Sequence, residues 1–290
     1  MSPLLFSLTV FLSVLFIVGI YWFLRYLRHG RFRRDLDLRL LSIRLPLKNS
    51  GDSNNENKKD PIAEIAYTAQ LLSSLVNTEA SFTLEVAVHN VGEEIIFYLA
   101  VPKKIVEFTK RQIEGLWGGS QIDFVSQDYT IFNSSGNVQL ATLKLKKHFA
   151  LPVSSYVEVE LDTFATILSN FSKINAVGEG LALQLVVKPV SKDAKKKITK
   201  AIIELKKGEK INDVLKPSFF DFLGKASSKK KKDEPEPEEP KIIDEEAIKS
   251  LEQKISKPLF SVNVRVCASS PTPYRTSELL EGVLGSFAQF

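Results

Sequence analysis

The amino-terminal stretch constrains the chain most, because no charged side chain occurs between Pro3 and Leu24. A helix of about 22 residues rises roughly 33 Å, which is enough to cross a hydrocarbon core about 30 Å thick. Tyr21 and Trp22 lie near the end of this stretch, where amphipathic rings favour the membrane interface. The stretch therefore predicts a transmembrane helix, with a buried core helix as the alternative.

Arginines follow the apolar stretch at once, and a basic flank is typical of the cytoplasmic side of a membrane helix. A cleavable signal peptide would carry its positive charge before the apolar run, so we expect the helix to be retained. The expected location is the bacterial inner membrane, crossed once, with the amino terminus outside and the soluble part in the cytoplasm. Arginines beside a membrane usually contact anionic headgroups, so the lipid bilayer is favoured over DNA as their partner. The candidate membrane-surface residues are Arg25, Arg28, Arg31, Arg33 and Arg34.

The composition is that of a folded protein, with 44% hydrophobic and 25% charged residues. The formal charge of +5 and the pI of about 9.0 resemble a nucleic-acid signal, but much of the excess lies beside the apolar stretch. Cys267 is the single cysteine, so the sequence contains no internal disulfide and suits a reducing compartment. Because Cys267 alternates with Val264 and Val266 in a strand-like run, we interpret its thiol as structural rather than reactive.

Residues 35–135 follow the order strand, helix, strand, strand, helix, strand. Asp60 and Pro61 supply a cap and a first-turn proline for the first helix, and Gly118-Gly119 ends the second. In this order two split βαβ units interleave into a four-stranded sheet with both helices on one face, which predicts a ferredoxin-like module. The expected strands are Leu36–Leu47, Phe82–Val88, Ile95–Val101 and Ile122–Phe132, and the expected helices are Ile62–Val76 and Ile105–Leu116.

The same order begins again in residues 136–290, interrupted by a charged insertion at about 191–257. Within the insertion, Lys192–Lys210 and Ile243–Ile255 predict charged helices, and Ser227–Pro240 predicts a flexible linker. No strand follows the final helix, so the neighbouring strand keeps unpaired backbone groups unless more chain or a partner fills the slot. The expected strands are Thr142–Leu151, Tyr156–Leu161, Leu181–Val190 and Pro258–Ala268, and the expected helices are Asp162–Phe171 and Thr272–Ala288.

The predicted fold class is therefore α+β, with an N-terminal transmembrane helix followed by two tandem ferredoxin-like (βαββαβ) modules. The second module is interrupted by the charged insertion and lacks its last strand. The predicted domains are the anchor with its basic flank (1–34), the first module (35–135) and the second, incomplete module (136–290).

We find no constellation of catalytic residues in the sequence and predict that this chain is not an enzyme. Gly224-Lys225 lacks both the upstream glycine and the following hydroxyl residue of a phosphate-binding loop. His29, His89 and His148 lie too far apart in sequence to support a metal site. No catalytic, cofactor-binding or metal-binding residue is therefore expected.

Three groups of side chains can be interpreted either as functional or, more simply, as part of the core or of the solvated surface. Paired carboxylates can perform acid and base chemistry, but Glu158, Glu160 and Asp162 more simply form a solvated face. Aromatic residues could stack the bases of single-stranded nucleic acid, although core packing is the simpler reading. Lysines after residue 143 could contact phosphates, although such runs are most often solvated. The aromatic residues are Phe97, Tyr98, Tyr129 and Phe132, and the lysines are Lys144, Lys146, Lys147 and Lys195–Lys197.

The tract from Arg33 to Pro189 resembles the membrane-anchored amino-terminal domain of conjugation-type, type IV secretion-like DNA-transfer ATPases of genome-reduced bacteria. The resemblance rests on LLSIRLP, DPIAEIAYTAQLLSSL, IIFYLAVPKKIVEFTKRQIEGLW and GEGLALQLVVKP. It continues in EEAIKSLEQKISKPLFSVNVRVCASSPTPYRTSELLEGVLGSFAQF. These are structural patterns, so they assign no catalytic residue.

The resemblance implies a non-catalytic membrane-tethering and assembly module of a DNA-transfer ATPase. In that family a motor domain normally follows the region where this chain ends, so the sequence is expected to be a fragment, a split gene product or a detached domain. The implied partners are the lipid bilayer, a motor ATPase domain in the same or an adjacent chain, and further copies of this chain. The alternatives are a cytoplasmic-face nucleic-acid-binding module, which would contact DNA directly, and a membrane-anchored scaffold unrelated to DNA transfer.

Overall fold

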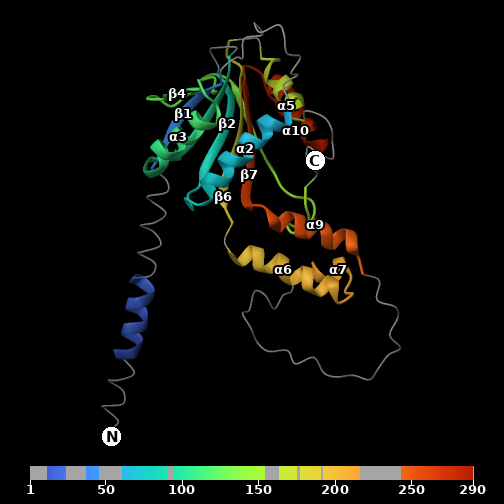
Figure 1. The fold of residues 1–290 in the computed structure, drawn as a ribbon. Coiled ribbons are helices and arrows are strands. Elements are labelled where there is room, and N and C mark those ends of the chain that lie inside the picture. The colour runs from blue at the N-terminus through green and yellow to red at the C-terminus, as the bar shows by residue number, and fades with distance from the viewer. Residues whose placement is uncertain are drawn as a thin grey trace, which may run out of the picture. The chain divides into compact units, whose positions relative to one another are not determined.

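The computed structural model describes residues 12–23, 37–45, 61–89, 94–153, 163–174, 177–190, 192–215 and 243–289 (Figure 1). Two compact units are distinguished: unit 1 comprises residues 1–84 and 97–128, and unit 2 comprises residues 85–96 and 129–290. The strands of the described residues are β1 (Leu38–Arg44), β2 (Phe82–Val88), β3 (Ile95–Pro102), β4 (Gln121–Phe124), β5 (Asn137–Leu143), β6 (Gly180–Pro189) and β7 (Phe260–Ser270). The α-helices are α2 (Pro61–Val76), α3 (Val106–Leu116), α5 (Thr163–Phe171), α6 (Lys192–Lys206), α7 (Ile211–Val214), α9 (Glu245–Ser256) and α10 (Pro273–Ser286), with short 3-10 helices at Lys103–Ile105 and Phe287–Gln289.

The membrane anchor expected from the sequence requires correction. Within the described part of the chain, no helix is both long enough and apolar enough to cross a membrane. The predictions of a transmembrane helix, and of a single-pass location in the inner membrane, are therefore wrong.

The sheet also differs from the predicted pair of separate modules. The seven described strands form one sheet in the order β4-β1-β3-β2-β6-β7-β5. The class is α+β, but a single sheet replaces the two that were expected. The order β4-β1-β3-β2 is the order in which interleaved split βαβ units place their strands. The predicted domain boundaries stay a prediction.

In unit 1, β1 pairs antiparallel with both β3 and β4. The helices α2 and α3 contact each other, and the side chains of Leu41, Leu75, Leu99 and Ile113 are almost completely buried. The helix α2 begins at Pro61, as the Asp60-Pro61 signal predicts. After α3 the chain reverses at Gly119, whose φ of 83° lies in the left-handed region that glycine adopts without strain.

In unit 2, β7 pairs antiparallel with β6 on one side and with β5 on the other. The helices α5 and α10 lie side by side on one face of these strands (Figure 1). Apolar residues that alternate along the strands meet them there and bury a core around Phe171. The remaining members of this cluster are Val86, Val88, Ile167, Ile174, Leu181, Leu183, Val266, Ala268, Leu279, Leu280 and Val283.

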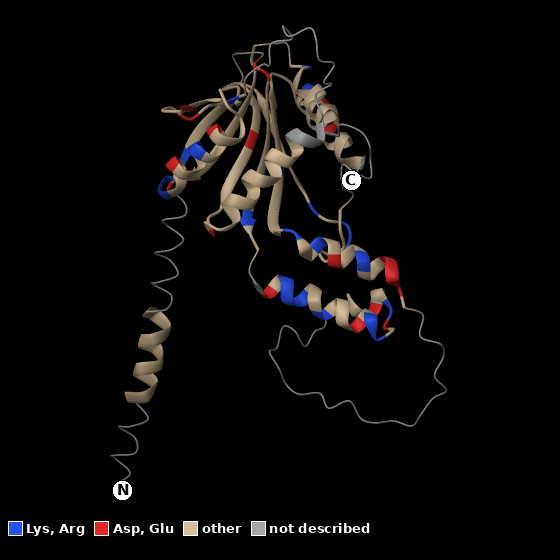
Figure 2. Ribbon diagram, viewed as in Figure 1, with Lys and Arg blue, Asp and Glu red and all other residues tan. Residues whose placement is uncertain are grey.

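The charged insertion contributes a helical pair with a core of its own. The predicted helices are present as α6 and α9, which lie side by side (Figure 2). Their apolar stripes bury Ile198, Ile202, Leu205, Ile248 and Leu251 against each other and against Ala150. Figure 2 shows lysines and acidic residues along both helices, as expected for an amphipathic pair. No residue is shared with the core around Phe171.

Several predicted elements have different bounds, and others lie outside the described residues. The strand expected at Ile122–Phe132 is shorter, because β4 ends at Phe124. The strand expected at Thr142–Leu151 is displaced toward the amino terminus, because β5 ends at Leu143. The predicted strand at Tyr156–Leu161 and the predicted linker at Ser227–Pro240 fall outside the described residues.

Candidate functional site

The candidate site is the strand β5, which ends the sheet order beyond β7. Its exposure alternates along all seven residues, and none of them is charged. Val138, Leu140 and Thr142 share the face opposite the helices, and Leu140 is 65% exposed. Ala141 and Leu143 point the other way and pack against the core of unit 2. An edge strand of this kind offers backbone N–H and C=O groups together with an apolar row.

The strand at the other end of the sheet order has a different character. β4 is only four residues long, and it contains Asp123. The carboxylate of Asp123 lies 3.7 Å from the guanidinium of Arg44 on the neighbouring β1 and accepts a hydrogen bond of 2.8 Å from the side chain of Gln121. Short length and charge are the features with which proteins protect a sheet edge against added strands. β5 has neither feature.

A turn clamped by Asn133 sets the start of β5. The side-chain oxygen of Asn133 accepts hydrogen bonds from the backbone N–H and the hydroxyl of Ser135, at 3.1 and 3.3 Å. Its side-chain NH2 donates to the carbonyl of Gly178 at 3.2 Å, and its backbone N–H donates to Ser269 Oγ at 3.1 Å. The turn is therefore tied both to the entry of β6 and to β7.

Two close backbone contacts require glycine in this region. A Cβ at Gly136 would lie 2.5 Å from the carbonyl oxygen of Ser270, and a Cβ at Gly180 would meet the backbone of Ile131. Both positions therefore demand the absence of a side chain. The segment before β5 lies directly against the ends of β6 and β7 as a result.

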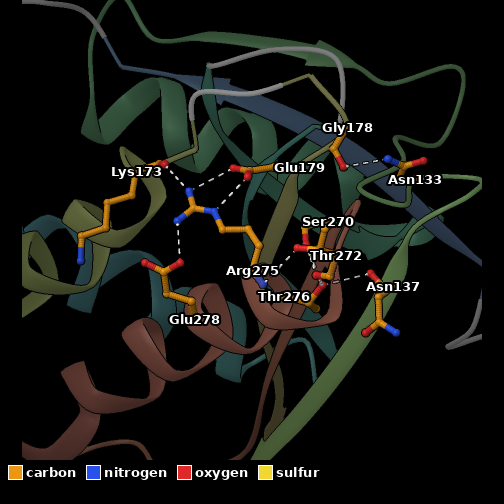
Figure 3. Close-up of polar contacts among 10 residues, drawn as sticks. All are labelled: Asn133, Asn137, Lys173, Gly178, Glu179, Ser270, Thr272, Arg275, Thr276 and Glu278. Atoms are coloured by element: carbon orange, nitrogen blue, oxygen red, sulfur yellow. Dashed lines mark hydrogen bonds and ion pairs between the residues drawn. The ribbon is translucent and has the colours of Figure 1, made fainter.

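Hydroxyl groups join β5 to α10. Ser270 Oγ and Thr276 Oγ1 lie 2.7 Å apart, and Thr276 Oγ1 donates to the carbonyl of Asn137 at 3.4 Å (Figure 3). Gln139, on the same strand face as Ala141, donates from its side chain to Ser277 Oγ at 2.9 Å. These contacts hold the first half of β5 against the helix.

Arg275 joins the amino-terminal end of α10 to two other segments. Its Nε and Nη2 donate to the two carboxylate oxygens of Glu179 at 2.9 and 3.2 Å. Nη1 donates to Glu278 at 3.1 Å, and Nη2 also donates to the carbonyl of Lys173 at 2.9 Å (Figure 3). Glu179 is only 7% exposed. Hydrogen bonding to the Glu179 carboxylate raises the pKa of Arg275, and partial burial opposes that shift.

A second polar cluster involves Glu85 in the middle of β2 and His89, which follows that strand. The hydroxyl of Tyr129 donates to Glu85 at 2.5 Å, and the ring of Tyr129 stacks parallel to that of His89 with centroids 5.1 Å apart. Burial lowers the pKa of His89, and the nearby charge of Glu94 opposes this by raising it. A neutral imidazole stacked on a phenol ring is the form that this environment favours.

Only some of the candidate functional residues named from the sequence are described by the structure. The membrane-surface residues Arg25, Arg28, Arg31, Arg33 and Arg34 lie outside the described residues, as do Glu158, Glu160, Asp162 and Gly224-Lys225. Cys267 lies in β7 between Leu140 of β5 and Ala182 of β6, and burial raises the pKa of its thiol. Of the four aromatic residues, Tyr98 is buried, Phe97 and Phe132 are exposed, and Tyr129 joins the Glu85 cluster.

The residues that position β5 were not found by sequence reasoning. Arg275 and Glu179 are separated by 96 positions, and Asn133 and Ser269 by 136. The turn itself carried a signal, because Asn-Ser-Ser-Gly at 133–136 is a typical turn sequence. Among the described residues, no group of three or more His, Cys, Asp or Glu side chains is arranged to hold a metal ion.

Comparison with known proteins identifies one family. No curated protein and no solved structure matches the chain. A sequence model described as "Domain of unknown function (DUF8128)" matches residues 45–290. The matched region contains every strand from β2 to β7, all of unit 2 and the part of unit 1 that follows residue 44. Because the match covers most of the chain, the protein belongs to the DUF8128 family.

Proposed function

We propose that this protein is a non-catalytic assembly module of a DNA-transfer motor ATPase and that it assembles through the edge strand β5. The observation that carries the proposal is a seven-residue, uncharged edge strand with an exposed apolar row. The amino-terminal half of this strand is fixed to α10, so its shape is set before any partner arrives. A preorganised edge binds with less loss of conformational entropy than a flexible segment would.

The choice of motor as the wider partner rests on the sequence resemblance to amino-terminal domains of DNA-transfer ATPases. In such an arrangement the motor domain supplies nucleotide chemistry, and the present chain supplies contacts. The polar network around Arg275 fits this division, because its carboxylates and guanidinium bind one another and so stabilise the fold. The proposal contains no tethering role, because that role depended on a membrane-crossing helix.

The test combines the full chain with the motor ATPase encoded in the same genome. We expect no ATP hydrolysis above background by the chain alone, and a stable complex with the motor in size-exclusion chromatography. ATP hydrolysis by the chain alone that co-purifies through two unrelated columns would show a catalyst instead. Failure to bind the motor at concentrations of tens of micromolar would remove the assembly role.

Direct DNA contact is a second candidate, and the lysines of α6 favour it. Lys195, Lys196, Lys197 and Lys200 lie on one helix (Figure 2). Acidic neighbours reduce this charge, because Lys196 lies 3.4 Å from Asp193 and Lys206 lies 2.7 Å from Glu252. A shift of labelled single-stranded DNA that persists at physiological ionic strength would support this candidate, whereas binding only at low salt would indicate nonspecific attraction.

A further inference from the structure

We propose that the partner of β5 is β5 of a second copy of this chain, so that two sheets join edge to edge across a two-fold axis. The inference rests on the proposed assembly role, because it uses the same edge. It adds the identity of the partner and the register of the contact.

The backbone of β5 can pair on one more side. In an antiparallel pair, alternate residues direct their N–H and C=O groups toward the partner, and the residues between them direct theirs away. β5 uses the first set toward β7 along its whole length, from Asn137 opposite Ser270 to Leu143 opposite Val264. Within the described part of the chain, no strand pairs with the other side. Our proposal uses this second set for a further strand.

Two copies of β5 have one register that pairs all seven residues. If the strands run antiparallel about Leu140, the residue numbers of each opposed pair add up to 280. Leu140 then lies opposite Leu140, and Val138 lies opposite Thr142. Because both partners in each pair have the same parity, the exposed rows of the two copies lie on the same sheet face. A slip by one residue would place exposed side chains against the faces covered by α10.

The side chains in this register complement each other. The three exposed positions of each copy would form a continuous row of leucine, valine and threonine, which are residue types that suit cross-strand pairs. Contact between Leu140 and its symmetry mate would cover part of a side chain that is 65% exposed. The contact is isologous, as a closed two-fold dimer requires.

The charged residues that flank β5 are compatible with the pairing. Lys144, Lys146 and Lys147 follow the strand, and Ser134, Ser135 and Gly136 precede it. In the two-fold register Lys144 lies opposite Gly136, and Lys146 lies opposite Ser134. Lysines of the two copies are therefore kept at opposite ends of the contact, where they do not oppose each other. A parallel arrangement would bring them side by side and would be repelled.

The first experiment measures the mass of the full chain by sedimentation velocity over a range of concentrations. We expect a reversible dimer for the natural sequence. Leu140→Lys places two ammonium groups opposite each other at the symmetry axis, so dimerisation should weaken by more than about tenfold. Leu145→Lys is the matched control, because Leu145 is 63% exposed and lies outside the paired stretch. This control should dimerise like the natural protein.

A second pair of variants tests the register and guards against misfolding. Val138→Lys alone should weaken the dimer, because it replaces the contacts between valine and threonine on both sides of the axis with a lysine that has no acidic partner. Val138→Lys combined with Thr142→Glu places each new lysine opposite the new glutamate of the other copy, so the dimer should return. Unchanged thermal unfolding of the monomers would show that every variant folds. Rescue by the double variant would support the register, and failure of that rescue would contradict it.

Other outcomes separate this inference from the assembly role. A natural chain that stays monomeric at tens of micromolar, or a Leu140→Lys variant that still dimerises, would overturn the inference. If the monomeric chain nevertheless binds the motor and Leu140→Lys abolishes that binding, the assembly role stands while the partner of β5 is the motor. If neither dimer nor motor complex forms, both proposals fail.

Discussion

Arg275 connects three segments that are distant in sequence: the turn after α5, the entry of β6 and the first turn of α10. Glu179 is the critical partner, because its carboxylate is nearly buried and accepts two hydrogen bonds from the same guanidinium. A bidentate pair of this kind fixes orientation as well as distance. The contribution of the Arg275–Glu179 pair to stability is measured by replacing one of the two residues and then both.

We predict that Arg275→Met lowers the free energy of unfolding by about 2–3 kcal/mol, because the Glu179 carboxylate would keep its burial and lose its partner. Arg275→Met combined with Glu179→Met should be less damaging than the sum of the two single variants. Urea denaturation of the four proteins completes a double-mutant cycle. Additive losses would show that the two side chains do not stabilise the fold as a pair.

We predict that stability falls as the pH drops below about 6.5, the ordinary pKa of histidine. Burial lowers the pKa of His89 in the folded protein, so the unfolded chain binds a proton more readily in this range. The contribution of His89 to the free energy of unfolding is therefore fully present above the pKa that this residue has in the unfolded chain. It is lost as the pH falls from that value toward the lower pKa of the folded protein. Thermal unfolding between about pH 7 and 5 measures the loss.

The matched variant for this prediction is His89→Phe, which keeps an aromatic ring over Tyr129 and removes the titrating group. Its unfolding temperature should depend less on pH over the same interval. An identical pH dependence in the two proteins would assign the effect to other groups.

The close contact between α5 and α10 depends on the absence of a side chain at Gly282. Asn170 on α5 donates from its side chain to Ser286 Oγ on α10 at 2.8 Å, and its oxygen accepts a hydrogen bond from Lys173 at 2.8 Å. A Cβ at Gly282 would lie 2.9 Å from that oxygen, whereas a Cβ at Gly285 would meet nothing within 4 Å. The two glycines belong to one helix but face different surroundings.

We predict that Gly285→Ala stabilises the protein by about 0.5–1 kcal/mol, because alanine loses less backbone entropy in a helix than glycine does. Gly282→Ala should give no such gain, since the new methyl group forces Asn170 to move. Chemical denaturation of both variants makes the comparison. Equal stabilisation by the two substitutions would show that α5 and α10 have more room than the structure shows.

Elements with local signals were predictable from the sequence, whereas the site was not. The start of α2 at Pro61 and the strands β2, β3, β6 and β7 follow from a capping signal and from alternation. The strand β5 was displaced because alternation continues through Leu143, Leu145 and the lysines beyond them. Pairing with β7 and the Asn133 turn decide where it ends and begins. Such long-range contacts leave no local pattern.

Unit 2 contains two apolar cores that share no residue, one around Phe171 and one between α6 and α9. We predict that Leu251→Ala, at a fully buried position, destabilises the helical pair by about 2–5 kcal/mol. Amide hydrogen exchange should accelerate in α6 and α9, while amides in β6 and β7 keep their protection. Uniform loss of protection across unit 2 would show that the cores unfold together.

The unlike ends of the sheet determine how far association can proceed. Because β4 is short and contains Asp123, a copy joined through β5 presents no second edge among the described strands that would accept another strand. Edge-to-edge growth therefore halts at two copies, and particle mass should reach a plateau as concentration rises. A sheet with two edges like β5 would instead grow into open-ended fibres.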